Sequence, residues 1–330
     1  MTCFVATSPG LYPLPDWAKD ELSERKGHQK HDLIDGSEGP EIAAVYDDVR
    51  SDLVASQTEA GLDRIVEGQG RWDDMLAHPL AVNDAVETRG IVRYYDNNNF
   101  YREPVVTGDL EPTGDIAADL EAVDVDPDRR QAVLPGPNSL AALATDEHYG
   151  DEADFLAAVA SLLAGELERC PTHGTCFLLE PSLVTDPPEN GERAREAIDT
   201  VAAATDADVV TFSYWDSFEE SLHAHLLDAD VEALGYDLVS DHESTRYLIQ
   251  EYGSADDIAL GLVDGQNTLV ESPETIRDRV HWLLEDLPVT DFGTVYLSTN
   301  TEPFYLPSSK FEEKLAVLGE AAETVEVTPA

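Results

Sequence analysis

Short apolar runs alternate with amphipathic segments along most of this 330-residue chain. The runs are continuous, which is typical of strands that are buried on both faces of a parallel sheet. Between most of them, apolar residues recur at helical spacing, as at Phe155, Val159 and Leu163. The pattern predicts eight strands, over residues 4–8, 63–67, 131–134, 176–179, 208–212, 233–239, 258–263 and 293–298.

Eight repetitions of strand and helix predict an α/β fold, a (β/α)8 TIM barrel that occupies residues 1–330 as a single domain. A doubly wound open sheet is the alternative, and it is weakened because no Gly-x-Gly-x-x-Gly follows the first strand. The connection at residues 68–130 is too long for an ordinary loop. Apolar pieces around Ile91 and Val105 predict a β-hairpin after the second strand, in an insertion at residues 90–130 that we expect over the barrel mouth.

The charge balance indicates the kind of medium in which such a barrel works. The chain has 68 acidic and 20 basic residues, for a net charge of −48, and the acids are spread along its whole length. At about 1 M salt the Debye length falls to about 3 Å, so repulsion between surface carboxylates is screened. We therefore expect a haloarchaeal protein in a high-salt cytoplasm, with no nucleic-acid partner and no membrane association.

Polar residues follow most of the predicted strands, at the barrel end that carries chemistry. Glu180 closes an apolar run directly before Pro181, where capping of the next helix explains a carboxylate poorly. We expect Glu180 and Asp237 to act as catalytic acid/base groups or as anchors for an amine. The expected substrate-binding residues are Gln69, Arg71, Asn138, Ser139, Trp215 and Asp216. Helix capping is an equally good explanation for Asp216, and packing against the pocket wall is the commoner role for Trp215.

One further cluster has the spacing of metal ligands. Cys170, His173 and Cys176 form a Cys-x2-His-x2-Cys pattern just before the fourth strand, at the barrel end that usually serves stability. Free cysteines are more often small buried apolar groups, so metal binding here stays open. With Cys3 the chain has three cysteines, which argues against a disulfide framework.

In their order and wording, the strand-end phrases resemble the cobalamin-independent methionine synthase family, above all its zinc-carrying barrel and its single-barrel archaeal forms. The similar phrases lie at residues 12–17, 61–71, 101–106, 136–140 and 179–183, where the last two resemble Gly-Pro-x-Thr-Leu and Asp-Glu-Pro-Ala-Leu. The resemblance implies a TIM barrel that methylates homocysteine from a methylated pterin. It also implies a zinc ion, which lowers the pKa of the homocysteine thiol and so makes a nucleophile at neutral pH.

The resemblance also implies where the zinc ligands of the family would fall, namely a His-x-Cys pair, a Glu and a last Cys. In this sequence those positions are Thr211, Ser213, Asp237 (or Gly235 in a shifted alignment) and Thr301. Neutral hydroxyls are poor zinc ligands, and one carboxylate cannot hold a tetrahedral site. We therefore expect no cofactor in the isolated chain.

Two functions follow from these expectations. The first is a zinc-free barrel that takes part in methyl transfer to homocysteine, as a 5-methyltetrahydropteroyltriglutamate–homocysteine S-methyltransferase-like protein. Its partners would be homocysteine, a methylated pterin or other methyl donor, and a zinc-bearing methionine synthase barrel on a separate chain. The second is a divergent metal-free barrel that binds a pterin or an amino acid and has no methyltransferase activity of its own.

Overall fold

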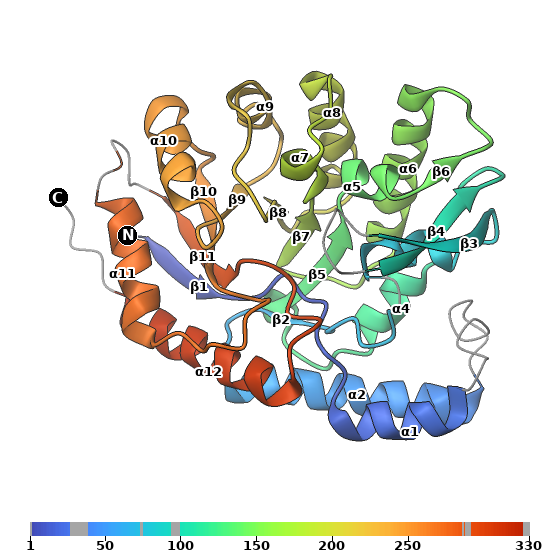
Figure 1. Ribbon diagram of the computed structural model, residues 1–330, viewed down its shortest axis with the longest axis horizontal. Helices are drawn as coiled ribbons and strands as arrows, with labels where there is room; N and C mark the ends of the chain where they lie inside the picture. Colours follow the sequence, from blue (N-terminus) through green and yellow to red (C-terminus); the bar gives the residue numbers. More distant parts are fainter. Residues whose placement is uncertain are drawn as a thin grey trace.

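Eight parallel strands form one curled sheet at the centre of the molecule (Figure 1). The computed structural model describes residues 2–26, 39–72, 75–93, 100–285, 287 and 292–325. The strand order is β1-β11-β10-β9-β8-β7-β5-β2, so from β2 onward each strand lies beside the next strand of the main sheet along the chain, and the last strand, β11, lies beside β1. The strands are β1 (Cys3–Ala6), β2 (Ile65–Val66), β5 (Arg130–Pro135), β7 (Thr175–Leu179), β8 (Asp208–Phe212), β9 (Ala233–Asp237), β10 (Asp257–Val263) and β11 (Thr294–Thr299).

The two edge strands of this sheet, β1 and β2, are tied to each other. The backbone amides of Asp63 and Arg64 donate to the carbonyl oxygen of Ala6, at 2.9 and 3.2 Å. In return, the Ala6 amide donates to Asp63 Oδ2 at 2.8 Å. The sheet therefore curls round in the manner of a TIM barrel, and all eight predicted strands are confirmed within a few residues of their expected ends.

Helices surround the sheet on its outer side (Figure 1). Several begin at residues whose side chains accept from the free amides of the first turn, as Asp151 does for α6 and Asp241 for α10. None of the helices described is long and apolar enough to cross a membrane. The helices are α1 (Asp16–Lys26), α2 (Pro40–Glu59), η2 (Met75–Ala77), α3 (His78–Ala81), α4 (Asp115–Glu121), η3 (Pro127–Arg129), α5 (Pro137–Ala142), α6 (Glu152–Leu167), α7 (Ser182–Thr185), α8 (Gly191–Ala202), α9 (Glu220–Leu226), α10 (His242–Tyr252), α11 (Pro273–Leu284) and α12 (Ser308–Thr324).

Aromatic side chains fill the inside of the curled sheet. The rings of Phe177 and Tyr296 are 6.1 Å apart although β7 and β11 are not neighbours in the sheet, so this contact crosses the interior. Phe212 packs against Phe177, with ring centroids 5.6 Å apart. Because side chains alternate between the two faces of a strand, these rings identify which residues point inward. Tyr296 also reaches a polar layer, where its hydroxyl donates to Asp208 Oδ2 at 3.1 Å.

The predicted hairpin after the second strand is confirmed as β3 (Val86–Arg93) paired antiparallel with β4 (Phe100–Val106). A short strand that we did not predict, β6 (Thr145–Asp146), adds to it in parallel with β4. The hydroxyl of Tyr101 donates to the carbonyl oxygen of Leu143 at 2.9 Å and so fastens the hairpin to the segment after α5. Residues 94–99 of the predicted insertion at 90–130 lie outside the described residues. Its place over the barrel mouth and the single-domain organisation stay predictions.

Candidate functional site

Four buried carboxylates mark the C-terminal edge of the sheet. Glu67 follows β2, Glu180 follows β7, Asp237 ends β9, and Glu302 lies just beyond β11; none is more than 4 % exposed. A carboxylate taken out of water is costly unless hydrogen bonds or cations compensate it. The partners of each group therefore show what that group can do.

Glu180 caps the N-terminus of α5. Its Oε1 accepts from the backbone amide and the side-chain Nδ2 of Asn138, at 3.0 and 2.9 Å, and its Oε2 accepts from the Ser139 amide at 2.7 Å. Burial raises the pKa of Glu180, and these bonds oppose that shift. The carboxyl group lies so close to Gly136 that a Cβ there would be 2.1 Å from its carbon atom. The structure thus brings three predicted site residues together, but it gives Glu180 the capping role that the sequence argued against, toward the helix of a neighbouring strand.

Asp237 is saturated with hydrogen bonds. Its Oδ1 accepts from the amides of Val239 and Ser240, at 2.8 and 2.9 Å. Its Oδ2 accepts from the Ser240 hydroxyl at 2.7 Å and from the Trp215 amide at 2.9 Å. The side-chain amide of Asn300 donates to both oxygens, at 3.1 and 3.0 Å. The carboxylate therefore joins the ends of three strands, and the expected catalytic role for it stays a prediction.

Trp215 and Asp216, which are neighbours in sequence, are placed differently. Trp215 has a φ of 85°, a strained left-handed conformation, and its ring lies edge-on to that of Tyr214 with centroids 4.8 Å apart. Its half-buried indole thus borders the strand ends. Asp216 is exposed, and its Oδ1 accepts from the Ser217 amide at 2.8 Å. The structure does not bring Asp216 together with the buried carboxylates.

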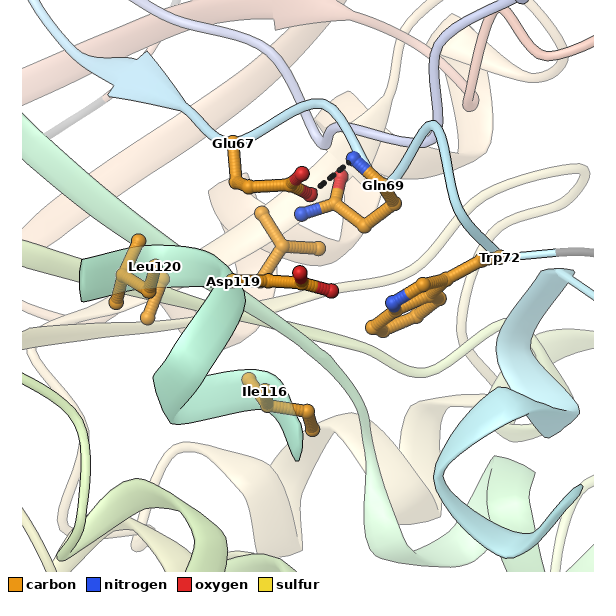
Figure 2. Close-up of a pocket in the computed structure, with 8 residues that line it drawn as sticks. Glu67, Gln69, Trp72, Ile116, Asp119 and Leu120 are labelled. Atoms are coloured by element: carbon orange, nitrogen blue, oxygen red, sulfur yellow. Dashed lines mark hydrogen bonds between the residues drawn. The ribbon is translucent and has the colours of Figure 1, made fainter. Parts of the chain in front are cut away.

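Gln69 holds two loops together at the mouth. Its side-chain Oε1 accepts from the Leu11 backbone amide at 2.8 Å. Its backbone amide donates to Glu67 Oε2 at 2.6 Å (Figure 2). Like Trp215, it has a positive φ, of 52°. Figure 2 shows Trp72 and Asp119 directed toward the same small space as Glu67. This cavity, of about 10 Å³, has room for about one water molecule and none for a substrate.

Arg71 belongs to a buried ionic cluster that we call the clasp, made of Arg50, Glu67, Arg71, Asp115 and Asp119. Arg50 on α2 donates from Nε to Glu67 at 3.0 Å and from a terminal nitrogen to Asp119 at 2.8 Å. Arg71 pairs with Asp119 at 3.0 Å and with Asp115, both on α4. Burial, together with the charge of Asp119, raises the pKa of Glu67 to about 7 against the opposing effect of Arg50. Arg71 thus fastens the insertion to the barrel, and its expected role in substrate binding stays a prediction.

Thr211, the first of the positions where a zinc ligand of the family would fall, does not face the inside of the sheet. The ring of Phe212 covers Gly235, where a Cβ would be 2.2 Å from it, and this ring belongs to the interior aromatic cluster. Strand alternation therefore directs the preceding residue, Thr211, toward the surrounding helices. Tyr214, two residues after Phe212, contacts the Phe212 ring with centroids 6.2 Å apart.

The other zinc positions are already engaged. The Ser213 hydroxyl donates to the Glu180 carbonyl oxygen at 2.8 Å, and the Thr301 hydroxyl donates to the Glu302 carbonyl oxygen at 3.3 Å. Asp237 has no lone pair to spare, as described above. Within the described part of the chain, no group of three or more His, Cys, Asp or Glu side chains is placed to hold a metal ion. The donors present at these positions do not fit a tetrahedral zinc ion.

The Cys-x2-His-x2-Cys cluster does not converge on one point either. His173 uses Nδ1 toward the carbonyl oxygen of Pro171 at 2.8 Å and Nε2 toward the Thr205 hydroxyl at 3.3 Å. Burial raises the pKa of the Cys170 thiol to about 12 and that of Cys176 further. Both thiols are therefore protonated at neutral pH in the metal-free chain.

Sequence reasoning missed Glu302. Both of its carboxylate oxygens are buried, and among the described residues neither has a partner at hydrogen-bonding geometry. Burial raises its pKa to about 7, while the Tyr214 side chain and its own backbone amide act in the opposite direction. The sequence held a usable signal, because Glu302 stands directly before Pro303 after a strand, just as Glu180 stands before Pro181.

Comparison with solved structures supports the fold. The chain is similar to a B12-independent methionine synthase from Shewanella sp. W3-18-1, solved in complex with selenomethionine, with a TM-score of 0.77, 16 % identity and 97 % of each chain covered. A putative vitamin-B12 independent methionine synthase from Listeria monocytogenes gives a TM-score of 0.71 at 17 % identity, with 99 % of each chain covered.

Comparison of sequences supports the family. The methionine synthase of Saccharolobus solfataricus is 21 % identical over 286 residues, which cover 84 % of this chain and 82 % of that protein. The methionine synthase of Sulfurisphaera tokodaii is 22 % identical over 287 residues, with 84 % and 80 % covered. The family model described as cobalamin-independent synthase, catalytic domain, matches residues 21–294. Since this match spans most of its length, the chain belongs to the cobalamin-independent methionine synthase catalytic domain family.

Proposed function

We propose that this chain is a zinc-free barrel of methionine biosynthesis that binds homocysteine and works beside a zinc-bearing methionine synthase barrel on a separate chain. The methyl donor in this proposal is a methylated pterin. One observation carries it: the chain keeps the fold of the family, yet hydroxyls or a saturated carboxylate stand at Thr211, Ser213, Asp237 and Thr301.

The reason for a partner is chemical. A free thiol has a pKa near 8.5, so only a small fraction is thiolate at neutral pH, and methyl transfer needs the thiolate. Glu180 and Asp237 are both committed to backbone and side-chain donors, which leaves them poorly suited to remove the thiol proton. Within this proposal they position the walls of the site, together with Asn138 and Gln69, and the partner supplies the activated thiolate.

Zinc content and activity test the proposal directly. The chain, purified in multimolar KCl, is expected to contain well under one zinc per molecule, to bind homocysteine saturably, and to transfer no methyl group alone. Adding the zinc-bearing barrel from the same source is expected to give methyl transfer faster than that barrel achieves by itself. One zinc per chain together with turnover by the isolated chain would refute the zinc-free assignment. Replacing Cys170 and Cys176 would then show whether that cluster holds the metal.

A second candidate function is favoured by Glu302. A buried carboxylate without a partner is typical of a ligand-binding site, which needs no methyl transfer. In this candidate the chain is a metal-free barrel that binds an amino acid or a pterin. Saturable binding of either compound, with no effect on the rate of the zinc-bearing barrel, would favour it over the first.

We also propose that the barrel is adapted to high salt. With a net charge of −48, repulsion among surface carboxylates is expected to lower the melting temperature steeply as KCl falls from about 3 M to 0.2 M. Circular dichroism at a series of KCl concentrations measures this. Sucrose at matched osmolality is the control, because it stabilises compact states without screening charge. A melting temperature independent of KCl would contradict the adaptation.

A further inference from the structure

The backbone that carries Glu302 is held in place on both sides. Asn300, two residues earlier, donates to the Asp237 carboxylate and accepts from the Gly265 amide at 2.9 Å. The Thr299 hydroxyl donates to the Thr301 carbonyl oxygen at 2.8 Å. Glu302 thus follows a segment in which the polar side chains of Thr299 and Asn300 are hydrogen-bonded.

That carboxylate differs from the other buried acids at the strand ends. Glu180 accepts three hydrogen bonds and Asp237 accepts six, from donors that the fold itself provides. Glu302 is 2 % exposed, and among the described residues neither of its oxygens has a donor at hydrogen-bonding geometry. The Tyr214 side chain and the Glu302 backbone amide approach the carboxylate and oppose the rise in its pKa. Leaving a buried acceptor unpaired costs stability, so a group that persists in this state needs an explanation.

A second buried polar group without a partner among the described residues lies on β11, the strand that precedes Glu302. The hydroxyl of Ser298 is fully buried and, within the described chain, has no hydrogen-bonding partner. Ser298 is two residues from Tyr296, whose ring lies inside the sheet, so strand alternation directs Ser298 inward as well. Tyr214, which also approaches from the end of β8, is close enough to act on the pKa of Glu302. Tyr214 therefore approaches this carboxylate from β8, and Ser298 lies four residues before it along the chain.

The chemistry of these groups selects the kind of ligand. A carboxylate repels anions, and no group of three metal-ligating side chains is formed in the described structure. A buried carboxylate gains most from a partner that both donates hydrogen bonds and carries a positive charge. Ser298, which can accept as well as donate, can share such a partner.

We propose that Glu302 is the recognition residue for the primary ammonium group of an amino-acid ligand bound at the barrel mouth. This inference rests on the proposed function, since homocysteine is the amino acid in question. The inference adds the residue that distinguishes an amino acid from a simple thiol. The Glu302 carboxylate, and no metal ion, makes the contact with the ammonium group.

Calorimetric titration in high KCl tests the inference with two probes, homocysteine and 4-mercaptobutanoate, which lacks the amino group. The unmodified chain is expected to bind homocysteine at least 10-fold more tightly than 4-mercaptobutanoate. Glu302→Gln is expected to weaken homocysteine binding about 10- to 100-fold and to abolish that preference, since a charge-assisted bond is lost. Glu312→Gln, at an exposed position on α12, is the matched control and is expected to bind both probes like the unmodified chain.

The outcomes separate the two ideas. If the unmodified chain binds homocysteine and Glu302→Gln binds it equally well, the inference is overturned and the proposed function stands. If the unmodified chain does not bind homocysteine, the proposed function fails, and with it an amino-acid occupant for Glu302. The melting temperature of Glu302→Gln adds a check, because removing an unpaired buried carboxylate is expected to leave it unchanged or raised at pH 8. A marked decrease would instead indicate a structural role and overturn the inference.

Discussion

Replacing Arg50 by methionine is expected to lower the free energy of unfolding by about 3–5 kcal/mol, because it leaves the buried Glu67 without a cation and leaves Asp119 with Arg71 alone. Arg50 is the only residue of the clasp, as defined above, that contacts both Glu67 and Asp119, at 3.0 and 2.8 Å. Denaturant unfolding in constant high KCl measures the change. Arg89→Met is the control, since Arg89 pairs with Glu147 at the surface and such pairs contribute at most about 1 kcal/mol.

The same variant carries a pH signature. The pKa of Glu67 is raised to about 7 in the fold, from about 4.3 in an unfolded chain, so the folded state holds this proton more tightly. Its contribution to stability is therefore full below about pH 4.5 and is lost as the pH rises to 7. Without Arg50 the loss is expected to become larger and to extend to higher pH, because the attraction that lowers the pKa of Glu67 in the fold is gone. Equal stability of Arg50→Met and the unmodified chain at pH 8 would show that the clasp does not hold the insertion.

Replacing Glu180 by alanine is expected to cost about 4 kcal/mol, the second large effect. The change leaves the Asn138 and Ser139 amides buried at the start of α5 with no acceptor, at about 1–3 kcal/mol each, and removes a charge that suits a helix N-terminus. Denaturant unfolding in high KCl again measures it. Glu180→Gln keeps one acceptor oxygen and should cost about half as much.

Homocysteine binding by folded Glu180→Gln then tests its place in the site. We expect the affinity to fall below detection, because in the proposed function α5 and its Asn138 side chain form one wall of the homocysteine site. The surface variant Glu121→Gln, on α4, is the control. If Glu180→Ala unfolds like the unmodified chain, the capping role is refuted; if Glu180→Gln binds homocysteine with unchanged affinity, Glu180 is no part of the site.

The carboxylates that follow the strands show how much a local sequence pattern can predict. The Glu-Pro pattern marked Glu180, and the same pattern marks Glu302, yet one carboxylate is saturated and the other has no partner in the described structure. Nothing near either residue in sequence predicts this difference. The donors to Glu180 lie 41 and 42 residues away, at the start of a helix that follows another strand.

The clasp shows the same limit. Arg71 stands in one of the phrases that resemble the family, and we expected it to bind substrate. Its partners, Asp115 and Asp119, come from the long insertion, which the sequence placed only roughly. Arg50, 69 residues from Asp119, gave no signal at all, because a helical arginine among acids is ordinarily a solvated surface residue.

The sequence by itself determined the eight strands, the hairpin after the second of them and the barrel class, because continuous apolar runs and helical spacing are local consequences of burial. It also determined that the zinc-ligand positions implied by its resemblance carry hydroxyls and a single carboxylate. Only the tertiary structure decided that the side chains of Glu180, Asp237 and Arg71 are engaged within the fold, and that the Glu302 carboxylate has no partner at hydrogen-bonding geometry among the described residues. The reason is that curling the sheet brings the ends of strands far apart in sequence together, and hydrogen bonding is settled by that proximity.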